Sequence, residues 1–497
     1  MKTVIIGAGP AGLTAGYEIS KESPDVVVVE SEDCVGGLAR SIRLWGQTVD
    51  LGPHRFFSND RRINELWVEV AARDYVMVKR QTRILYRDRL FQYPLQFLDV
   101  LRGLGPIEAL KCLASYSHEW FAPTPQNGSF EDWVSHRFGR RLFEIFFKTY
   151  SEKLWGIPCS DLDADFATQR IRKFSLSSAI QTALAPKSGK NHRTLVNEFA
   201  YPHGGTGSIY ERMAEAICQR GGQVRLKTPV KKVLTEECRP KVTSTGSLRV
   251  AGGTPPSIRL NVTGVELASG EKLASHCVIS TMPLTVMVTQ MDGTPSHVLE
   301  ACQQLRFRNT ILVYLEVLND NPFPDNWIYV HSPDLLFGRV TNFRNWAPQL
   351  FGSSPNAILA MEYWCDAGDE FWNRDDQQIA ALARVEILKS ALVSRADQLG
   401  RSFVFRLPRC YPVYRRGYQK PLQVIKQYLQ TISGLQVIGR YGSFKYNNQD
   451  HSILMGRLAA ENALRQTEHD LWRVNTDDVY QETSAIAETG LVPTISR

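Results

Sequence analysis

The first thirty residues constrain the fold of this chain more than any other stretch. A short apolar run over residues 2–6 leads directly into glycines with the spacing G-x-G-x-x-G, and residues 13–20 then have the pattern of a helix. A second apolar run over residues 26–29 ends on an acid, Glu30. This order of strand, glycine turn, helix and strand predicts a βαβ unit that binds a dinucleotide.

Each part of this predicted unit has a physical role. Gly7 makes the tight turn, Gly9 lets the backbone approach a pyrophosphate, and Gly12 lets the helix pack closely on the strand. The phosphates would lie at the unpaired N–H groups of the helix start, and Glu30 would accept hydrogen bonds from the ribose hydroxyls. The alternative is a chance glycine turn. The strand, the helix and the acid all stand in their expected places, which favours dinucleotide binding.

Length and composition indicate a globular protein with more than one domain. The 497 residues exceed what one core usually holds, so two or three domains are expected. A hydrophobic fraction of 43% and a charged fraction of 22% are ordinary for globular chains. No apolar run reaches about 18 residues, so no membrane span is predicted. The chain opens directly into a strand, which leaves no room for a cleaved signal peptide.

Cysteine and charge patterns narrow the environment and the partners. The nine cysteines are scattered and form no C-x-x-C pair, which favours reduced thiols in a cytoplasm and argues against a disulfide framework or a metal site. The net charge of +7 permits an anionic small-molecule substrate. A nucleic-acid partner is not expected, because no basic tract or aromatic–basic repeat is present. The sequence assigns no oligomeric state.

A second glycine turn distinguishes between dinucleotides. Gly36 and Gly37 follow soon after the ribose acid and lead to Leu38 and Arg40. A plain NAD site has no such turn. The stretch resembles the extended signature of two-dinucleotide-binding flavoproteins, in which this turn and Arg40 close over FAD. The alternative is a surface turn with a solvated arginine. The resemblance implies FAD and the amine-oxidase-like superfamily.

Strand and helix patterns return to the dinucleotide-binding type near residue 200 and again near 435. We therefore expect an α/β fold, α+β overall, with a Rossmann-like FAD-binding domain that is discontinuous in sequence. The predicted division is 1–60, 198–290 and 430–466 for the FAD-binding domain, 61–197 for a mainly helical substrate domain, 291–429 for an antiparallel-sheet substrate domain, and 467–497 for a C-terminal tail.

Four local patterns inside the substrate domains are specific enough to predict elements. Residues 83–96 are typical of a hairpin with its turn at 87–89. Ser129 is a candidate N-cap for a helix that Gly139 would end. β-branched and aromatic runs over residues 308–363 predict an antiparallel sheet, and a helix is predicted from about residue 376 to 399.

Several blocks together are similar to one family. They are GRYGSFKYNNQDHS at 439–452, Gly-Pro-His at 52–54, Tyr-Pro-x-Gln at 93–96, Lys-x-Trp-x-x-Pro at 153–158 and Gly-Gly-Thr-Gly at 204–207. These blocks resemble those of the UDP-galactopyranose mutase family, most nearly its eukaryotic-type branch. The matches run in the family's order from residue 4 to about 464.

This resemblance implies a reaction. A mutase of this family interconverts the pyranose and furanose forms of a nucleotide-linked sugar. Reduced FAD attacks the anomeric carbon and displaces the nucleoside diphosphate, so no protein nucleophile is needed. NADPH or NADH is then a candidate reductant.

The resemblance also implies residues that hold the departing diphosphate. Arg170 and Arg339 fall where the family keeps two diphosphate arginines, and arginine suits that task because its planar donors bind phosphate bidentately. Tyr418 and Tyr446 match the two tyrosines that reach the diphosphate. His54, in the Gly-Pro-His block, completes the catalytic set. For each arginine the alternative is a solvated or salt-bridged side chain.

Two further sets of residues follow from the same resemblance, and no metal ligand is among them. The cofactor set is Gly7, Gly9, Gly12, Glu30, Gly37, Leu38, Arg40, Gly52, Val230, Arg440, Asn448 and Gln449. The substrate set is Arg83, Tyr93, Gln96, Trp155, Trp327 and Tyr329. Each aromatic residue in it could equally belong to the core. Ser151 stands where the family has an asparagine near the uracil, so the nucleotide need not be uridine.

Three functions from different classes remain at this stage. The first is the sugar-nucleotide mutase, which is redox-neutral but needs reduced FAD. The second is an FAD-dependent oxidoreductase of the amine-oxidase or protoporphyrinogen-oxidase type, with an apolar pocket and no need for paired arginines. The third is a non-catalytic binding module on the same fold. Arg40, Arg440 and the motif at 448–450 argue against the third, because a module without flavin would not need them.

Overall fold

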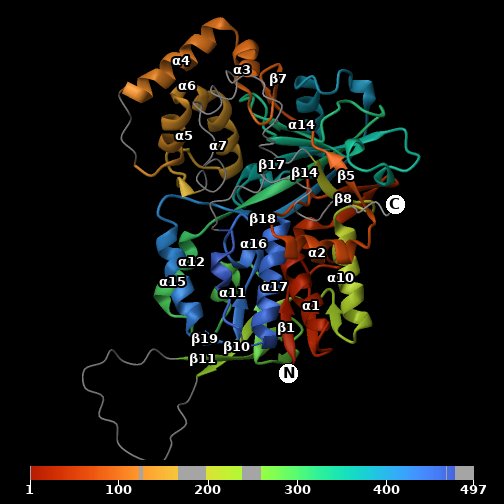
Figure 1. Ribbon diagram of the computed structural model, residues 1–497, viewed down its shortest axis with the longest axis vertical. Coiled ribbons are helices and arrows are strands. Elements are labelled where there is room, and N and C mark those ends of the chain that lie inside the picture. Colours follow the sequence, from red (N-terminus) through yellow and green to blue (C-terminus); the bar gives the residue numbers. More distant parts are fainter. Residues whose placement is uncertain (1, 122–126, 166–197, 238–258, 466, 476–497) are drawn as a thin grey trace, which may run out of the picture. The chain divides into compact units, whose positions relative to one another are not determined.

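The computed structural model describes residues 2–121, 127–165, 198–237, 259–465 and 467–475. These residues form two compact units (Figure 1). Unit 1 takes its described residues from Met1–Gly37, Tyr210–Arg306 and Tyr418–Asn475, and unit 2 takes its own from Leu38–Ile209 and Phe307–Gly417. Neither unit is therefore one continuous segment of the sequence.

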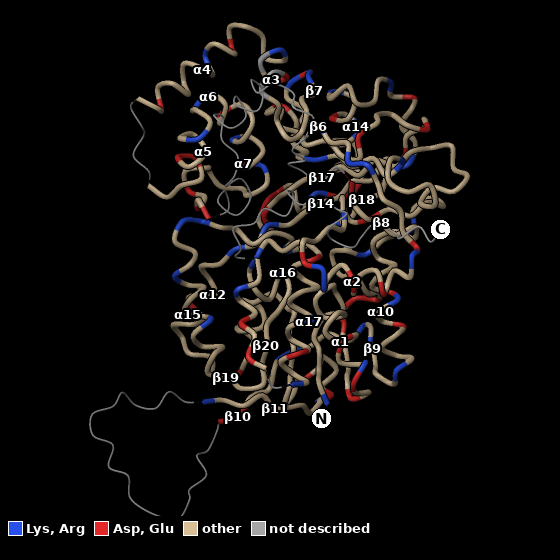
Figure 2. Tube along the Cα trace, in the orientation of Figure 1, with Lys and Arg blue, Asp and Glu red and all other residues tan. Residues whose placement is uncertain are grey.

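Unit 1 is built on a parallel sheet of five strands. Their order is β20 (Leu435–Val437), β13 (Cys277–Ser280), β1 (Thr3–Ile6), β2 (Val26–Val29) and β9 (Gln223–Arg225), and every neighbouring pair is parallel. Every residue of β1 and β2 is buried, and neither strand contains a charged residue. Figure 2 colours the charged residues along the described trace. Burial on both faces explains why these strands are continuous apolar runs in the sequence.

Helices and a second sheet complete unit 1. Helix α1 (Pro10–Ser20) packs against α17 (Gln449–Arg465), and the two lie side by side in Figure 1. The other helices are α10 (Gly207–Gln219), which begins in unit 2, α11 (Leu284–Thr289), α12 (Ser296–Gln304), α15 (Gln419–Gln430), α16 (Gly439–Gly442) and the 3₁₀ helix η6 (Leu471–Arg473). In the second sheet β11 (Leu260–Leu267) pairs with β10 (Val230–Glu237), β12 (Lys272–Ala274) and β19 (Ile432–Ser433).

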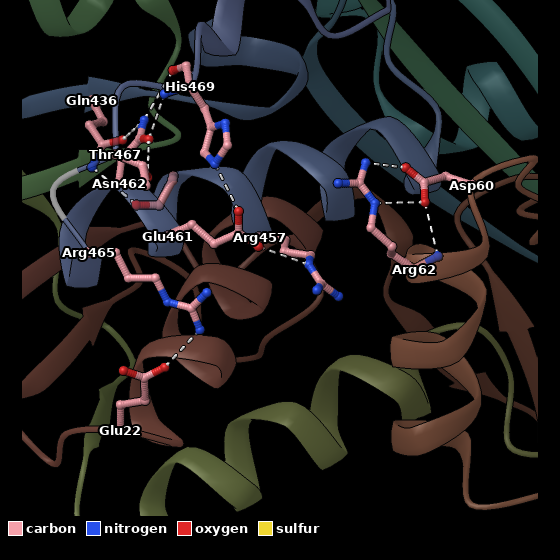
Figure 3. A network of polar contacts seen from close by, with 11 residues as sticks. Glu22, Asp60, Arg62, Gln436, Arg457, Glu461, Asn462, Arg465, Thr467 and His469 are labelled. Carbon is pink, nitrogen blue, oxygen red and sulfur yellow. Dashed lines mark hydrogen bonds and ion pairs between the residues drawn. The ribbon is translucent and has the colours of Figure 1, made fainter.

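Polar contacts attach the end of α17 to its surroundings in unit 1 (Figure 3). Arg465 lies 3.4 Å from the carboxylate of Glu22. Glu461 pairs with His469 at 2.9 Å, and the Asn462 amide donates to the carbonyl of His469 at 3.1 Å. These contacts hold the segment that follows α17 against the helix it has just left.

Unit 2 contains a seven-stranded sheet. Its order is β18 (Leu399–Pro412), β14 (Phe307–Val317), β17 (Ala357–Cys365), β16 (Arg339–Asn342), β15 (Trp327–Val330), β6 (Thr82–Tyr86) and β7 (Arg89–Gln92). All pairs are antiparallel except β15 with β6. The predicted antiparallel sheet and the predicted hairpin at 83–96 are confirmed. Two smaller pairs are β3 (Ser41–Leu44) with β4 (Gln47–Asp50) and β5 (Tyr75–Lys79) with β8 (Glu198–Pro202).

Unit 2 also contains helices. They are α2 (Arg61–Ala71), α3 (Phe97–Leu104), α4 (Pro106–Phe121), α5 (Phe130–Phe138), α6 (Arg140–Phe143), α7 (Thr149–Trp155), α13 (Glu370–Asn373), α14 (Asp376–Lys389) and the 3₁₀ helices η1 (Gly37–Ala39), η3 (Phe343–Asn345), η4 (Pro348–Leu350) and η5 (Ala396–Gln398). Of these, α3, α7 and α14 contact strands of the seven-stranded sheet. A π-helical turn, η2 (Glu144–Lys148), leads directly into α7. Ser129 caps α5 by accepting the Asp132 N–H at 3.1 Å, and Gly139 ends it, which confirms both predictions.

The prediction that a helix runs to residue 399 is wrong at its C-terminal end. Helix α14 ends at Lys389, and Ala391 has a left-handed φ of 57°. The hydroxyl of Ser390 donates to the Ile387 carbonyl at 2.6 Å and accepts the Leu392 N–H at 3.3 Å. A serine that bonds neighbouring backbone groups in this way competes with the helix.

The predicted fold class is confirmed, because helices combine with a parallel sheet in unit 1 and a mostly antiparallel sheet in unit 2. The division into three domains remains a prediction. Of the helices that the structure describes, none has both the length and the apolar character that crossing a bilayer requires. Among the same residues, no three His, Cys, Asp or Glu side chains form a group that could hold a metal ion.

Candidate functional site

The first glycine turn is sterically closed to side chains at two positions. Gly7 has a φ of 97°, and a Cβ there would lie 2.0 Å from Oγ1 of Thr281. A Cβ on Gly12 would lie 2.0 Å from the carbonyl oxygen of Gly7. Contacts this short cannot relax where one partner is backbone. These two glycines therefore hold the turn between β1 and α1 in the shape that the motif predicts.

Gly9 leaves open space at the start of α1. A Cβ on Gly9 would meet one heavy atom outside its chain neighbours within 4 Å, the Cα of Gly37 at 3.8 Å. Gly9 is also the N-cap of α1, and the first turn of that helix contains no acid. An open cradle at a helix N-terminus that offers N–H groups fits a pyrophosphate. This part of unit 1 therefore fits the phosphates of FAD.

Glu30 is more occupied by the protein than its sequence position indicates. Its Oε2 accepts the Ala8 N–H at 2.7 Å, and its Oε1 accepts the Ser31 hydroxyl and the Glu32 N–H, each at 3.0 Å. The carboxylate thus braces the glycine turn, a role that the motif alone does not indicate. Two carboxylate oxygens provide about four acceptor positions, so one remains on Oε2 for a ribose hydroxyl.

The C-terminal block of unit 1 brings several candidates together in two groups. The Arg440 guanidinium lies 4.3 Å from the centre of the Tyr446 ring. The Tyr418 ring lies 6.2 Å from that of Phe444, in the same block. The other candidates in this unit are Gln449, whose amide oxygen accepts the Tyr210 hydroxyl at 2.7 Å, Asn448, whose N–H donates to His451 Nδ1 at 3.2 Å, and Val230, which begins β10 opposite Leu267.

In unit 2 a buried carboxylate joins two of the sequence blocks, and sequence reasoning missed it. Asp50 accepts the hydroxyls of Ser41 at 2.5 Å and Tyr201 at 2.8 Å, and the Thr206 N–H at 3.2 Å. The Tyr314 hydroxyl donates to its carbonyl at 2.8 Å. Burial raises the pKa of Asp50 to about 6, although these hydrogen bonds oppose the rise.

This network carries over to the Gly-Pro-His block. The Thr206 hydroxyl donates to the His54 carbonyl at 3.0 Å, so the block at 204–207 holds the block at 52–54. Gly52 has a φ of 117°, and a Cβ there would lie 3.6 Å from Oε1 of Glu362. The signal that could have indicated Asp50 is its place two residues before Gly52, next to the Gly-Pro-His block.

Arg339 and Glu362 form a buried ion pair across two strands. They are register partners on β16 and β17. Nε and Nη2 of the arginine donate to the two carboxylate oxygens at 2.5 and 2.6 Å, and Glu362 is 2% exposed. Burial opposes the charge on Arg339, but Glu362 outweighs it and holds the pKa of the guanidinium well above its usual value. This fork uses two of the five guanidinium N–H groups, and three remain for a ligand.

A cluster of aromatic rings adjoins this pair in unit 2, because Tyr329 on β15 is the register partner of Arg339. The Tyr329 ring lies 5.1 Å from that of Tyr93 and 5.5 Å from that of Tyr150. Tyr150 stacks on His331 at 4.8 Å and meets Trp364 edge-on at 5.5 Å. Sequence reasoning found Tyr93 and Tyr329 but missed the other three. Tyr150 had a usable signal, since it lies on the same short helix as Trp155.

The remaining candidates of unit 2 are not members of this cluster, although the Trp327 ring meets that of Tyr329 at 6.4 Å. Trp155 is almost fully buried against Tyr411 and Tyr414. Trp327 is almost fully buried against Phe199 and Trp346. Arg83 forms a bidentate pair with Asp325, and Gln96 is exposed just before α3. Arg40 lies 5.2 Å from the ring of Phe405, and Leu38 is part of η1. Arg170 lies outside the described residues. The substrate roles of all these residues remain predictions.

A protein-family model described as flavin containing amine oxidoreductase matches residues 10–390. The chain belongs to this family. Membership of the flavin containing amine oxidoreductase family implies FAD, and the glycine cradle and Glu30 fit that cofactor.

Similarity to individual proteins covers less of the chain in sequence than in structure. A probable UDP-galactopyranose mutase of Klebsiella pneumoniae is 26% identical over 168 residues, 32% of this chain and 42% of that protein. An uncharacterised protein of Methanothermococcus thermolithotrophicus is 48% identical over 54 residues, 11% of this chain and 52% of its own length. The chain thus matches about half the length of these curated relatives or less.

Two crystal structures resemble nearly the whole chain. A reduced UDP-galactopyranose mutase superposes with a TM-score of 0.78 and 21% identity, covering 96% of this chain and 98% of that one. A putative protoporphyrinogen oxidase from Exiguobacterium sp. 255-15 superposes with a TM-score of 0.70 and 16% identity, covering 94% and 99%. At these identities the likeness establishes the amine-oxidase fold and leaves the reaction open.

Proposed function

We propose that this protein is a flavin-dependent mutase that interconverts the pyranose and furanose forms of a nucleotide-linked sugar. The observation that carries the proposal is Arg339, whose guanidinium has one edge fixed by Glu362 and which lies opposite Tyr329 in the sheet. Among the described residues, Glu362 is the only hydrogen-bond partner of the Arg339 side chain. Three directed N–H groups beside aromatic rings suit a nucleoside diphosphate, which presents phosphate oxygens and a base.

The proposal gives the chain's own residues the tasks of binding and release. Arg339 would bind the diphosphate and hold it after it leaves the sugar, because a guanidinium stays charged throughout. Arg170, Tyr418 and Tyr446 keep the diphosphate-binding role that the family resemblance implies, and Tyr329 would flank the nucleoside. When bound, reduced FAD would supply the nucleophile that displaces the diphosphate from the anomeric carbon.

The remaining assignments are proposed on the same basis. The cofactor and substrate sets, His54 as a catalytic candidate and the three-domain division are all part of the proposal. We propose NADPH or NADH as the reductant. The described cysteines are free thiols, which suits a cytoplasmic location.

An FAD-dependent oxidoreductase is the second candidate, and one observation favours it. Glu362 neutralises Arg339, so the pair contributes no net charge to unit 2. A neutral pair is compatible with an oxidisable organic substrate, such as the one implied by the family's description as amine oxidoreductases. The two candidates differ in whether electrons leave the substrate.

A redox-controlled isomerisation assay separates them. The holoprotein is reduced anaerobically with dithionite, mixed with UDP-galactofuranose, and the sugar isomers are separated by chromatography. The mutase predicts pyranose product with reduced protein and none with the oxidised protein as matched control. Flavin reduction by an oxidisable substrate, with no isomerisation, would support the oxidoreductase instead.

A further inference from the structure

The connection between β15 and β16 is held by an ammonium group from another element. Lys153, on α7, donates from Nζ to the carbonyls of Val330 at 3.1 Å, Ser332 at 2.7 Å and Phe337 at 3.4 Å. These three carbonyls lie at the end of β15 and near both ends of the connection, residues 331–338. One side chain therefore ties both ends of the connection to α7.

A carboxylate holds the same connection through its N–H groups. Glu386, on α14, is 5% exposed and accepts the N–H of Leu336 at 2.6 Å and that of Phe337 at 3.3 Å. It also accepts the Tyr363 hydroxyl at 3.0 Å. The carbonyl of Phe337 thus bonds Lys153 while its N–H bonds Glu386. The ammonium of Lys153 and the carboxylate of Glu386 therefore bond the same stretch of backbone.

This stretch leads directly into the proposed ligand site. Gly338 follows Phe337, and its N–H donates to the carbonyl of Glu362 at 2.9 Å. Arg339 comes next and begins β16. At the other end, Val330 follows Tyr329 on β15, and its N–H donates to the Gly338 carbonyl at 2.8 Å. The contacts of Lys153 and Glu386 therefore fix the backbone positions of Arg339 and Tyr329.

Burial opposes the positive charge of the Lys153 ammonium. Burial lowers the pKa of its ammonium to about 8, and the charges of Glu386 and Asp334 only partly offset this. Asp334 itself pairs with the exposed Lys389 at 3.2 Å. His331, on the same connection, stays neutral, because burial and then the charge of Lys153 lower its pKa to about 3. A lysine held in this way gives up its proton in mildly alkaline solution.

We propose that Lys153 is a positioning residue for Arg339: together with Glu386 it forms a clamp on residues 331–338 that sets the guanidinium for a nucleoside diphosphate and loosens when the ammonium loses its proton. The identity of the ligand rests on the proposed function, whereas the clamp itself does not.

Nucleotide binding tests the positioning. UDP is titrated into the reduced holoprotein by calorimetry, using wild type, Lys153→Met, Lys153→Arg and, as matched control, Lys389→Met. This control removes an exposed lysine at the end of α14 that bonds Asp334, on the same connection. We expect Lys153→Met to bind UDP about tenfold more weakly, because residues in one hydrogen-bond network are coupled. Lys389→Met should bind as wild type does. Equal affinity in Lys153→Met and wild type would overturn the proposal.

The pH profile distinguishes positioning from a merely structural role. Wild-type affinity should fall as the pH rises through about 8, where the Lys153 ammonium deprotonates. Lys153→Arg keeps its charge, so its affinity should stay level over the same range. Because UDP is the same in both titrations, its own ionisation cancels in the comparison. Parallel profiles for the two proteins would contradict the proposal.

Amide hydrogen exchange tests the clamp without any ligand. The N–H groups of Leu336 and Phe337 should exchange faster in Lys153→Met than in wild type, and at the wild-type rate in Lys389→Met. If exchange changes as expected but wild type binds no nucleoside diphosphate, the proposed function fails and the clamp stands. If wild type binds UDP and exchange in Lys153→Met is unaltered, the clamp is wrong.

Discussion

The phosphate cradle of unit 1 is made of backbone groups, whereas the proposed diphosphate site of unit 2 depends on side chains from two neighbouring strands. The cradle at Gly9 and Gly37 consists of N–H groups and the absence of Cβ atoms. The pair of Arg339 and Glu362 exists only because β16 and β17 align in one register. The first kind of site suits a ligand shared by a whole family, and the second can vary with the substrate.

The largest effect should come from filling the backbone site. In Gly12→Ala the new Cβ would lie 2.0 Å from a backbone oxygen, so α1 must shift away from β1. We expect a loss of about 3 kcal/mol or more of stability and the loss of bound FAD. Flavin absorbance of the purified protein measures this. Gly368→Ala, where a Cβ meets nothing within 4 Å, is the control. If the Gly12→Ala protein is as stable as wild type and keeps its bound flavin, the proposed difference between the two units is wrong.

The buried carboxylate of unit 2 should give a pH-dependent effect of similar size. Burial raises the pKa of Asp50 from 3.8 to about 6, so between these values the folded state binds more protons than the unfolded state. Wild type should therefore lose about 3 kcal/mol of stability relative to Asp50→Asn as the pH rises from about 4 to above 6. Urea unfolding of both proteins across this range measures the gap. A gap that does not change with pH would show that Asp50 titrates normally.

The smallest effect should come from a charge-preserving change in the side-chain site. Arg339→Lys keeps a cation opposite Glu362, so the folded protein should unfold at nearly the wild-type temperature. A lysine cannot hold a carboxylate with one edge and a phosphate with the other. We expect UDP affinity to fall about tenfold, or about 1.4 kcal/mol. Unchanged affinity by calorimetry would remove Arg339 from the proposed diphosphate site.

The same contrast explains what the sequence could predict. The βαβ unit depends on residues within one short segment, so strand, turn and helix were all predicted from their spacing. Glu362 lies 23 residues from Arg339, and Lys153 lies 184 from Phe337. No local pattern joins such positions. They become neighbours only through strand register and the packing of α7.

Hydrogen bonds from side chains to backbone are also not visible in a periodic pattern. The helix expected to reach residue 399 stops at Lys389, because Ser390 bonds the backbone on both sides of itself. The ribose role of Glu30 stays a prediction, and in unit 1 its carboxylate also accepts the Ala8 N–H. In both cases a polar side chain bonds backbone groups of the protein, and residue spacing does not reveal that.

The central claim is that the flavin serves a reaction without net oxidation. The direct measurement follows sugar isomers and the flavin spectrum together during many turnovers of the reduced holoprotein under anaerobic conditions. The mutase predicts that pyranose and furanose forms reach equilibrium while the flavin stays reduced and no electron acceptor is consumed. Turnover that stops when the acceptor is withheld, with an oxidised product and no isomer formed, would contradict the account.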